Sequence, residues 1–329
     1  MRSQRAEGRV QSAKGSAFCN MPHALCPMLY ALCSMLYVSL PMKTLRSYLR
    51  LCKVSISFFA ACSAATGFIL VSSTPMSMIV PVIGVFLLAC GSSALNQYQE
   101  RDIDARMERT RQRPVPSGEI TASHAITVSL ILITAGLFFL IYGVGMVAFG
   151  LGLGAILWYN GAYTYLKKKT AFAAVPGALV GAIPPAIGWV SGGGDLFSPR
   201  LLALCLLFFL WQVPHFWLLI LRHGKEYEEA SLPSLTGLLS RSQISRITFV
   251  WIFATAGASL LLPLYGMGNS KIASFSLFPA AVWLVWNGMK LLGEKSTPDF
   301  AIHGFNRMNG YIFIVMSLLS ADKIFFLIS

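Results

Sequence analysis

The chain has 329 residues, of which 55% are hydrophobic and 12% are charged, and it carries a formal net charge of +13. Its charged residues cluster between long apolar runs, which is typical of a helical membrane protein and excludes an evenly solvated globular domain. The runs are also too long for the alternating segments of about ten residues that build a membrane β-barrel. Because the cations are concentrated in alternate loops, we expect no nucleic-acid partner.

Residues 1–41 precede the membrane spans and contain a tandem heptad, "ALCPMLY" followed by "ALCSMLY", at 24–37. A start that contains Arg and Ser also fits a transit peptide. We interpret the segment as a non-native or dispensable extension, because Met42 opens "MKTLRSYLRLCK", a basic lead into a first span. Residues 42–329 then form one membrane domain.

Apolar runs of about 18 residues or more predict membrane-spanning helices. Such runs occupy residues 54–72, 75–95, 125–142, 144–163, 171–191, 201–221, 247–266, 272–289 and 310–328. The predicted fold is therefore all-α, a polytopic bundle of nine transmembrane helices.

Lysine and arginine mark one side of this predicted bundle. They are frequent in the segment before the first span and in the loops after the second, fourth, sixth and eighth spans, whereas the other side has only Arg200, Lys271 and Lys323. By the positive-inside rule the basic loops face the cytoplasm, or the matrix in a mitochondrion. We expect an integral protein of the bacterial inner membrane with cytoplasmic active-site loops.

The loop after the second span is rich in charge. Its segment "NQYQERDIDARMERTRQRPVPSGEI", residues 96–120, holds five arginines and five carboxylates. If the second span continues as a helix, Asn96, Glu100 and Asp104 recur every four residues and form one stripe of oxygen-bearing side chains. Such hard oxygen ligands suit Mg²⁺, which is typically bound by one or two carboxylates together with substrate phosphates.

The same segment offers cations for a phosphate group. Arg109 and Arg113, again four residues apart, can present bidentate forks to phosphate oxygens. Pro114 and Pro116 are expected to end the helix. A solvated loop helix held by surface ion pairs has the same spacing, so this segment taken alone leaves both interpretations open.

Two further clusters fall on the same predicted side of the membrane. The loop after the sixth span, "LRHGKEYEEASLPSL", contains Arg222, Lys225 and Glu226, and the loop after the fourth, "YTYLKKKT", contains Lys167 and Lys168. Acidic and basic clusters that meet at one membrane face fit a site for Mg²⁺ and a diphosphate whose lipid tail lies between the helices.

Three stretches carry a resemblance to a known family. They are "MERTRQRP" in the charged segment, "GAIPPAIGW" in the fifth span and "WQVPHFW" in the sixth, and their order and spacing are similar to those of the UbiA-type prenyltransferases. Within that family the chain most resembles the enzymes that farnesylate protohaem IX, from about residue 46 to the end of the chain. The resemblance implies a nine-helix α bundle with a central cavity.

The resemblance also implies a reaction. Members of the family bind farnesyl diphosphate through Mg²⁺ held by two acidic motifs, ionise it, and let a vinyl group of haem b attack the allylic cation. By this match the first motif, catalytic and metal-binding, is Asn96, Glu100 and Asp104. The second, with the same roles, is centred on Glu226, where an aspartate is usual.

Cations of this chain would, by the same match, bind and neutralise the leaving diphosphate. Cationic groups aimed at developing negative charge lower the barrier to ionisation, and a dry cavity keeps the allylic cation from early quenching by water. The candidate diphosphate ligands are Arg109, Arg113, Lys167, Lys168, Arg222 and Lys225.

His215 and Trp211 are candidates for contact with haem. A histidine within an apolar span is a functional candidate, and neutral imidazole is a common axial ligand of haem iron. A histidine that only hydrogen-bonds to a neighbouring helix remains the alternative. Trp211 and its aromatic neighbours can shield an allylic cation by cation–π contact.

Two other functions remain open. A related UbiA-type enzyme would prenylate an aromatic quinone precursor instead of haem. The other is a membrane transporter, although ion-coupled transporters usually carry ionisable groups in mid-membrane, and these spans have almost none apart from His215. The expected partners are farnesyl diphosphate, haem b and the lipid bilayer, with haem-biosynthesis or terminal-oxidase assembly proteins as candidate protein partners.

Overall fold

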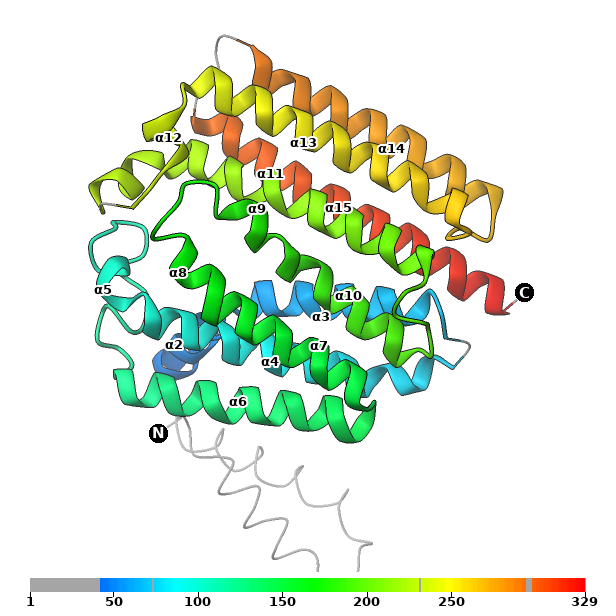
Figure 1. The fold of residues 1–329 in the computed structure, drawn as a ribbon, viewed down its shortest axis with the longest axis horizontal. Helices are drawn as coiled ribbons and strands as arrows, with labels where there is room; N and C mark the ends of the chain where they lie inside the picture. The colour runs from blue at the N-terminus through cyan, green and yellow to red at the C-terminus, as the bar shows by residue number, and fades with distance from the viewer. Residues whose placement is uncertain (1–41, 73, 231, 294–297, 329) are drawn as a thin grey trace, which may run out of the picture. The chain divides into compact units, whose positions relative to one another are not determined.

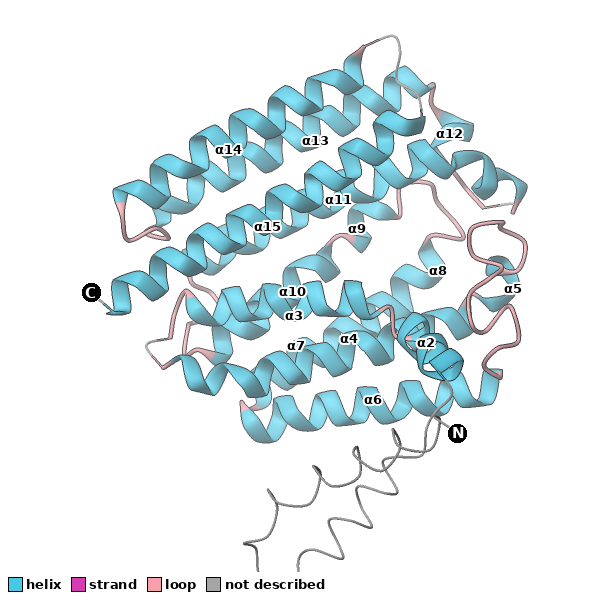
Figure 2. Cartoon of the chain, turned by 180° about the vertical axis from the view of Figure 1, so that it is seen from behind, coloured by secondary structure: helices cyan, strands magenta, loops and turns pink. Residues whose placement is uncertain are grey.

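The computed structural model describes residues 42–72, 74–230, 232–293 and 298–328. Within this part of the chain every regular element is a helix, which confirms the all-α prediction (Figure 2). The interpretation of residues 1–41 lies outside the described residues and stays a prediction. The chain divides into two compact units, Met1–Arg46 and Ser47–Ser329, and the helices from α3 onward belong to the second.

Eight of the described helices are long and apolar enough to cross a membrane, and a ninth span results if α2 and α3, which meet at a bend of 51°, count as one. This count agrees with the nine predicted runs. The elements are α2 (Met42–Leu51), α3 (Val54–Ile69), η2 (Pro75–Met78), α4 (Ile79–Gln99), α5 (Arg101–Asp104), α6 (Ala122–Gly143), α7 (Met146–Ile156), η3 (Leu157–Tyr163), α8 (Thr164–Leu166), α9 (Ala174–Gly177), α10 (Leu179–Ser191), α11 (Pro199–Glu229), α12 (Leu235–Leu238), α13 (Arg241–Leu261), η4 (Leu262–Tyr265), α14 (Lys271–Met289), η5 (Lys290–Leu292) and α15 (Pro298–Ile328).

The helix starts follow from local sequence. Thr121 caps α6 by accepting a hydrogen bond from the backbone N–H of His124, and Ser240 forms a capping box with Gln243 at the start of α13. Pro199 opens α11, where its missing N–H is not needed. Because these residues stand in the polar loops, each of the three helices begins a few residues before its apolar run.

The outer face of α14 is apolar. Ile272, Phe275, Phe278 and Trp286 are exposed on it, each over at least 60% of its surface. Side chains of this size are costly to expose to water, whereas contact with hydrocarbon carries no such cost. Their exposure fits a helix that faces lipid.

The helices from α3 to α15 lie side by side, with α5, α8 and α12 gathered at one end and the C-terminal end of α15 at the other (Figure 1). α3 packs against α4 and α10, and α11 packs against α10, α13 and α15. α5 and α12 lie in the loops after the second and sixth spans, and α8 is the last turn of the fourth span, next to the loop that follows it. The loops that are predicted to share one side of the membrane therefore share one end of the bundle.

The contact between α3 and α10 is close because glycines line it. A Cβ atom on Gly188 would meet the backbone carbonyl of Ala64, and one on Gly67 would meet the backbone carbonyl of Pro185. Small residues let neighbouring transmembrane helices approach each other in this way. The contact holds together two helices that both line the cavity.

Two large clusters of buried apolar side chains form the core. One joins α3, α4, α6, α7 and α10, and it includes Val85 and Leu88. The other joins α9 and α10 to the helices that follow them, and it includes Phe208 and Trp211. These four side chains all line a common cavity between the clusters.

Candidate active site

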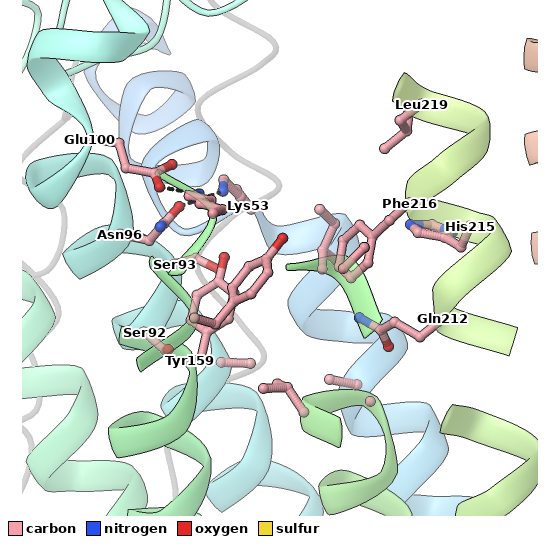
Figure 3. Close-up of a pocket in the computed structure, with 18 of the residues that line it drawn as sticks. Lys53, Ser92, Ser93, Asn96, Glu100, Tyr159, Gln212, His215, Phe216 and Leu219 are labelled. Atoms are coloured by element: carbon pink, nitrogen blue, oxygen red, sulfur yellow. Dashed lines mark hydrogen bonds and ion pairs between the residues drawn. The ribbon is translucent and has the colours of Figure 1, made fainter. Parts of the chain in front are cut away.

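The cavity between the two clusters has a volume of about 880 Å³. This value lies in the upper part of the range of about 300–1,000 Å³ that is typical of small-molecule sites. Figure 3 shows Lys53, Asn96 and Glu100 on one wall, across from Phe216 and Leu219. The cavity therefore joins a charged region to an apolar chamber.

The predicted stripe is present. Asn96, Glu100 and Asp104 are buried and all line the cavity. The stripe crosses the junction between α4 and α5, where the Glu100 N–H donates to the Asn96 carbonyl and the Asp104 N–H donates to the Glu100 carbonyl. These bonds keep the four-residue spacing. Burial of all three side chains rules out the alternative of a solvated surface helix.

The helix ends earlier than predicted. α5 stops at Asp104 rather than at Pro114 or Pro116, and the loop that follows forms turns. The Thr110 hydroxyl donates to the Asp104 carbonyl at 2.9 Å, and the Arg113 guanidinium folds back to the Asp104 carboxylate at 2.6 Å. The Thr110 hydroxyl thus satisfies a backbone carbonyl at the helix end, and Arg113 ties the loop to the same residue, so no proline is required to stop the helix.

Cations neutralise the buried carboxylates. Arg113 pairs with Asp104, and Lys167 forms an ion pair with Glu100. Two more of the predicted diphosphate ligands line the cavity, Arg109 and Lys168. Four of the six predicted cations are therefore brought to the cavity that holds the stripe.

The second predicted motif lies at the C-terminal end of α11. Glu226 accepts a hydrogen bond from the backbone N–H of Arg109 at 3.0 Å, and its other oxygen lies 2.8 Å from Nδ1 of His223. Glu226, Arg222 and Lys225 are not among the described residues that line the cavity. The structure thus ties Glu226 to the loop that follows the stripe, rather than placing its carboxylate in the stripe itself.

His215 lines the cavity from α11. Its Nδ1 lies 2.8 Å from the side-chain oxygen of Asn309 on α15, and because that oxygen can only accept, Nδ1 carries the proton. The His215 ring also contacts Phe305 and Trp211, with centroid distances of 4.5 and 5.0 Å. His215 thus bonds to a neighbouring helix and also lines the cavity, and its contact with haem stays a prediction (Figure 3).

Several polar residues that line the cavity are missing from the sequence prediction, among them Lys53, Gln212 and Asn309. Lys53 lies at the bend between α2 and α3 with a positive φ of 45°, and its ammonium donates to Asn96 at 3.3 Å. Gln212 and Asn309 line the cavity from α11 and α15. Amides within apolar spans are a signal that could have found the last two. For Lys53 the sequence offers only a basic lead into a span.

The oxygens of the stripe fit a divalent cation. Asn96, Glu100 and Asp104 offer an amide oxygen and two carboxylates, which is the hard set that Mg²⁺ takes when phosphates complete its shell. Among the described residues, no three His, Cys, Asp or Glu side chains are grouped so that they could hold an ion by themselves. The stripe therefore offers hard oxygen ligands but not a complete metal site by itself.

Comparison with known proteins agrees with this chemistry. The model of the UbiA prenyltransferase family matches residues 54–310. The chain is 44% identical over 194 residues to a protoheme IX farnesyltransferase of Geobacter sulfurreducens, which covers 59% of this chain and 72% of that protein. It is 34% identical over 281 residues to a protoheme IX farnesyltransferase of Oleidesulfovibrio alaskensis, which covers 85% of this chain and 97% of that protein.

Solved structures share the fold. A structure of digeranylgeranylglyceryl phosphate synthase matches with a TM-score of 0.69 at 16% identity, covering 86% of this chain and 99% of that chain. A UbiA homologue from Archaeoglobus fulgidus bound to GPP and Mg²⁺ matches with a TM-score of 0.61 at 16% identity, covering 83% and 99%. At such identity the likeness concerns the fold alone, and it confirms the predicted bundle.

Proposed function

The chain belongs to the UbiA prenyltransferase family and is a prenyltransferase, and on this premise we propose that it farnesylates haem b. In the proposed reaction a farnesyl group passes from farnesyl diphosphate to a vinyl group of haem b and gives haem O. The observation that carries the proposal is the cavity, which joins carboxylates and cations to an apolar chamber that contains a histidine. The names of the relatives supply the farnesyl donor and the acceptor.

The charged end of the cavity is the proposed diphosphate site. Arg113 and Lys167 already lie against carboxylates of the stripe, so phosphate oxygens bound there would meet cations in place. Preorganised cations stabilise the negative charge that develops on a leaving group. The proposed ligands are Arg109, Arg113, Lys167 and Lys168, which line the cavity, together with Arg222 and Lys225, which do not line it in this structure.

Asn96, Glu100 and Asp104 are the proposed Mg²⁺ ligands, with Glu226 from the second motif as a further one. When bound, the ion neutralises charge on the phosphate oxygens as a Lewis acid. The Mg²⁺ and GPP of the Archaeoglobus fulgidus homologue, which shares the fold, support this assignment. The stripe lies at one end of the cavity, so a diphosphate held there would direct its prenyl chain into the apolar chamber.

The apolar chamber is the proposed place of carbon–carbon bond formation. The bond from the farnesyl C1 to oxygen breaks, and its electron pair leaves with the diphosphate. The π electrons of the vinyl group form the new bond, and water adds to the resulting cation and loses a proton. Trp211, Phe216 and Tyr159 line this chamber and are proposed to exclude bulk water and to stabilise the farnesyl cation. His215 and Trp211 are the proposed haem contacts.

We also propose an orientation in the membrane. The loops that hold or adjoin α5, α8 and α12 carry most of the Lys and Arg outside the first 41 residues, which favours the cytoplasmic face of a bacterial inner membrane. Haem b and farnesyl diphosphate would then be bound from the cytoplasmic side or from the bilayer. Haem-biosynthesis or terminal-oxidase assembly proteins are the proposed protein partners on that side.

Mass analysis of haem tests the proposed function. Purified protein incubated with farnesyl diphosphate, haem b and Mg²⁺ is expected to convert haem b into a product heavier by a farnesyl group and one hydroxyl group. Unchanged haem together with a prenylated hydroxybenzoate or naphthoate would instead identify a quinone-precursor enzyme. Export of a labelled solute from vesicles without any prenylated product would identify a transporter.

Variants of Glu226 test the second motif. Glu226→Asp keeps the charge and restores the usual residue, so it is expected to retain substantial activity, whereas Glu226→Ala should lose about a hundredfold in turnover. Glu229→Ala is the matched control, because Glu229 is an exposed carboxylate at the end of the same helix. Turnover of Glu226→Ala equal to that of Glu229→Ala would remove Glu226 from the site.

A further inference from the structure

A π-helical turn, Leu157–Tyr163, interrupts the membrane span between α7 and α8. Such turns are rare and occur often at functional sites. This one carries Tyr159 and Tyr163, which both line the cavity. Its middle residue, Asn160, is only 3% exposed and lies against α4. The turn therefore has one side in the cavity and one side bonded to the helix of the stripe.

Four hydrogen bonds join Asn160 to α4. Its amide nitrogen donates to the Ser92 carbonyl at 3.0 Å and to the Gln99 side-chain oxygen at 3.1 Å, and its amide oxygen accepts from the Ser92 hydroxyl at 2.5 Å. The Gln99 amide nitrogen donates to the Asn160 carbonyl at 3.0 Å. Ser92 and Gln99 lie about two helical turns apart on one face of α4. Asn160 is thus hydrogen-bonded to two residues that lie about two turns apart on α4.

Thr164 makes a second link between the turn and α4. Its hydroxyl accepts from the Asn96 amide at 3.2 Å and donates to the Tyr159 carbonyl at 2.8 Å. Asn96 belongs to the stripe. The first motif and the π-helical turn are therefore one hydrogen-bonded unit.

This unit lines the cavity through Asn96, Tyr159 and Tyr163. Tyr159 and Tyr163 stack at 5.7 Å, and Tyr163 stacks on Phe216 of α11 at 6.0 Å. The Lys167 ammonium lies 5.5 Å from the centre of the Tyr163 ring. Figure 3 shows Tyr159 beside the polar cluster, facing the cavity. The tyrosines are placed where a cation that forms next to the diphosphate would meet them.

We propose that Asn160 is a positioning residue for prenyl transfer, which holds the π-helical turn on α4 and so fixes Tyr159 and Tyr163 where they shield the farnesyl cation from water. A π-helical turn contains about one residue more than an α-helical turn. If the turn relaxed to an α-helix, α7 would therefore rotate by about 100° relative to α8. The tyrosine pair would then lose its alignment with Lys167. This inference rests on the proposed function, because shielding has meaning only if a prenyl cation forms.

The test compares two fates of the farnesyl group in purified protein supplied with farnesyl diphosphate, haem b and Mg²⁺. Capture by haem gives prenylated haem, and capture by water gives farnesol or its allylic isomer. In Asn160→Ala the ratio of prenylated haem to farnesol is expected to fall by about tenfold, with the KM for farnesyl diphosphate changed by less than about threefold. Asn160→Asp, which keeps an acceptor for Ser92 but loses the donated bonds, should lie between Asn160→Ala and the wild type.

Asn287→Ala is the matched control, because Asn287 donates to the Trp283 carbonyl within α14 and does not belong to the cavity wall described here. Its product ratio should equal that of the wild type. An unchanged ratio in Asn160→Ala would overturn the positioning role. If Asn160→Ala does not fold, an unchanged ratio in Asn160→Asp would overturn it equally.

Amide hydrogen exchange gives a readout that does not depend on activity. Exchange across residues 157–166 should become faster in Asn160→Ala than in Asn287→Ala, and equal exchange would show that Asn160 does not hold the turn. If the wild type forms no prenylated haem, the proposed function fails and the positioning role in it fails too. Exchange would still decide whether the link to α4 exists.

Discussion

Asp104→Asn is expected to lower turnover by about a hundredfold or more, while the protein stays folded and inserted in the membrane. The substitution keeps the size of the side chain and much of its hydrogen bonding, but it removes a charge from the buried stripe beside Arg113. The loss of one preorganised electrostatic contact typically costs about 3 to 4 kcal/mol in the transition state. Turnover is measured as prenylated haem formed at saturating farnesyl diphosphate. Glu100→Gln is expected to behave alike.

Asp102→Asn is the matched control for this experiment. Asp102 lies on the same short helix, but its side chain is 79% exposed and its ion pair with Arg101 lies at the surface. An exposed pair contributes only about 0 to 1 kcal/mol, so turnover should stay close to that of the wild type. Near-normal turnover in Asp104→Asn as well would contradict the assignment of the stripe.

A Mg²⁺ titration separates two causes of lost activity in Asp104→Asn. If Asp104 binds the metal, half-maximal turnover of the variant requires a higher Mg²⁺ concentration than that of the wild type. If Asp104 serves only as the partner of Arg113, the Mg²⁺ dependence is unchanged and the KM for farnesyl diphosphate changes instead. The two outcomes assign the carboxylate to the metal or to the arginine.

Gly188→Ala is expected to destabilise the folded protein by about 3 kcal/mol or more. The added methyl group would meet the backbone of Ala64, and a backbone carbonyl cannot rotate away as a flexible side chain can. α3 and α10 would have to separate, which opens the contact that joins them. Thermal unfolding in detergent, followed by circular dichroism and size-exclusion chromatography, measures the effect.

Gly154→Ala provides the comparison for Gly188→Ala. Gly154 lies in α7, and nothing stands within 4 Å of the Cβ atom that the substitution adds. Alanine favours a helix by about 0.8 to 1 kcal/mol over glycine, so this variant should be as stable as the wild type or slightly more stable. Equal unfolding temperatures for the two variants would contradict the close packing of α3 on α10.

The helices could be predicted because an apolar segment in lipid has few other ways to form the hydrogen bonds of its backbone N–H and C=O groups. Their ends could not be predicted as well. α11 continues to Glu229, well beyond the predicted span end at residue 221, because its polar extension is held by contacts such as that of Glu226 with the Arg109 backbone. The bend at Lys53 has no signal in the apolar pattern either, since it depends on one residue with a positive φ.

The site residues divide in the same way: local spacing predicts some of them, and only contacts between distant parts of the chain identify the others. The stripe of Asn96, Glu100 and Asp104 could be predicted because its helical spacing is local in the chain and continues across the junction of α4 and α5. Asn160 could not, because its partners on α4 lie more than sixty positions earlier in the chain. The bond between His215 and Asn309 likewise joins two spans that only the folded bundle brings together. Side chains bound by distant partners need the tertiary structure.

The two buried clusters on either side of the cavity have a mechanical consequence. Each packs its own apolar side chains, and Leu151 and Val190 are among the few that pack against both. Close-packed interiors resist compression, so each half acts as a stiff body and deformation concentrates where packing is absent. Deformation is therefore expected in the cavity itself, where packing is absent. Because α10 contributes Ala186 to one cluster and Ile187 to the other, a ligand that needs more room would move cavity side chains rather than separate the two clusters.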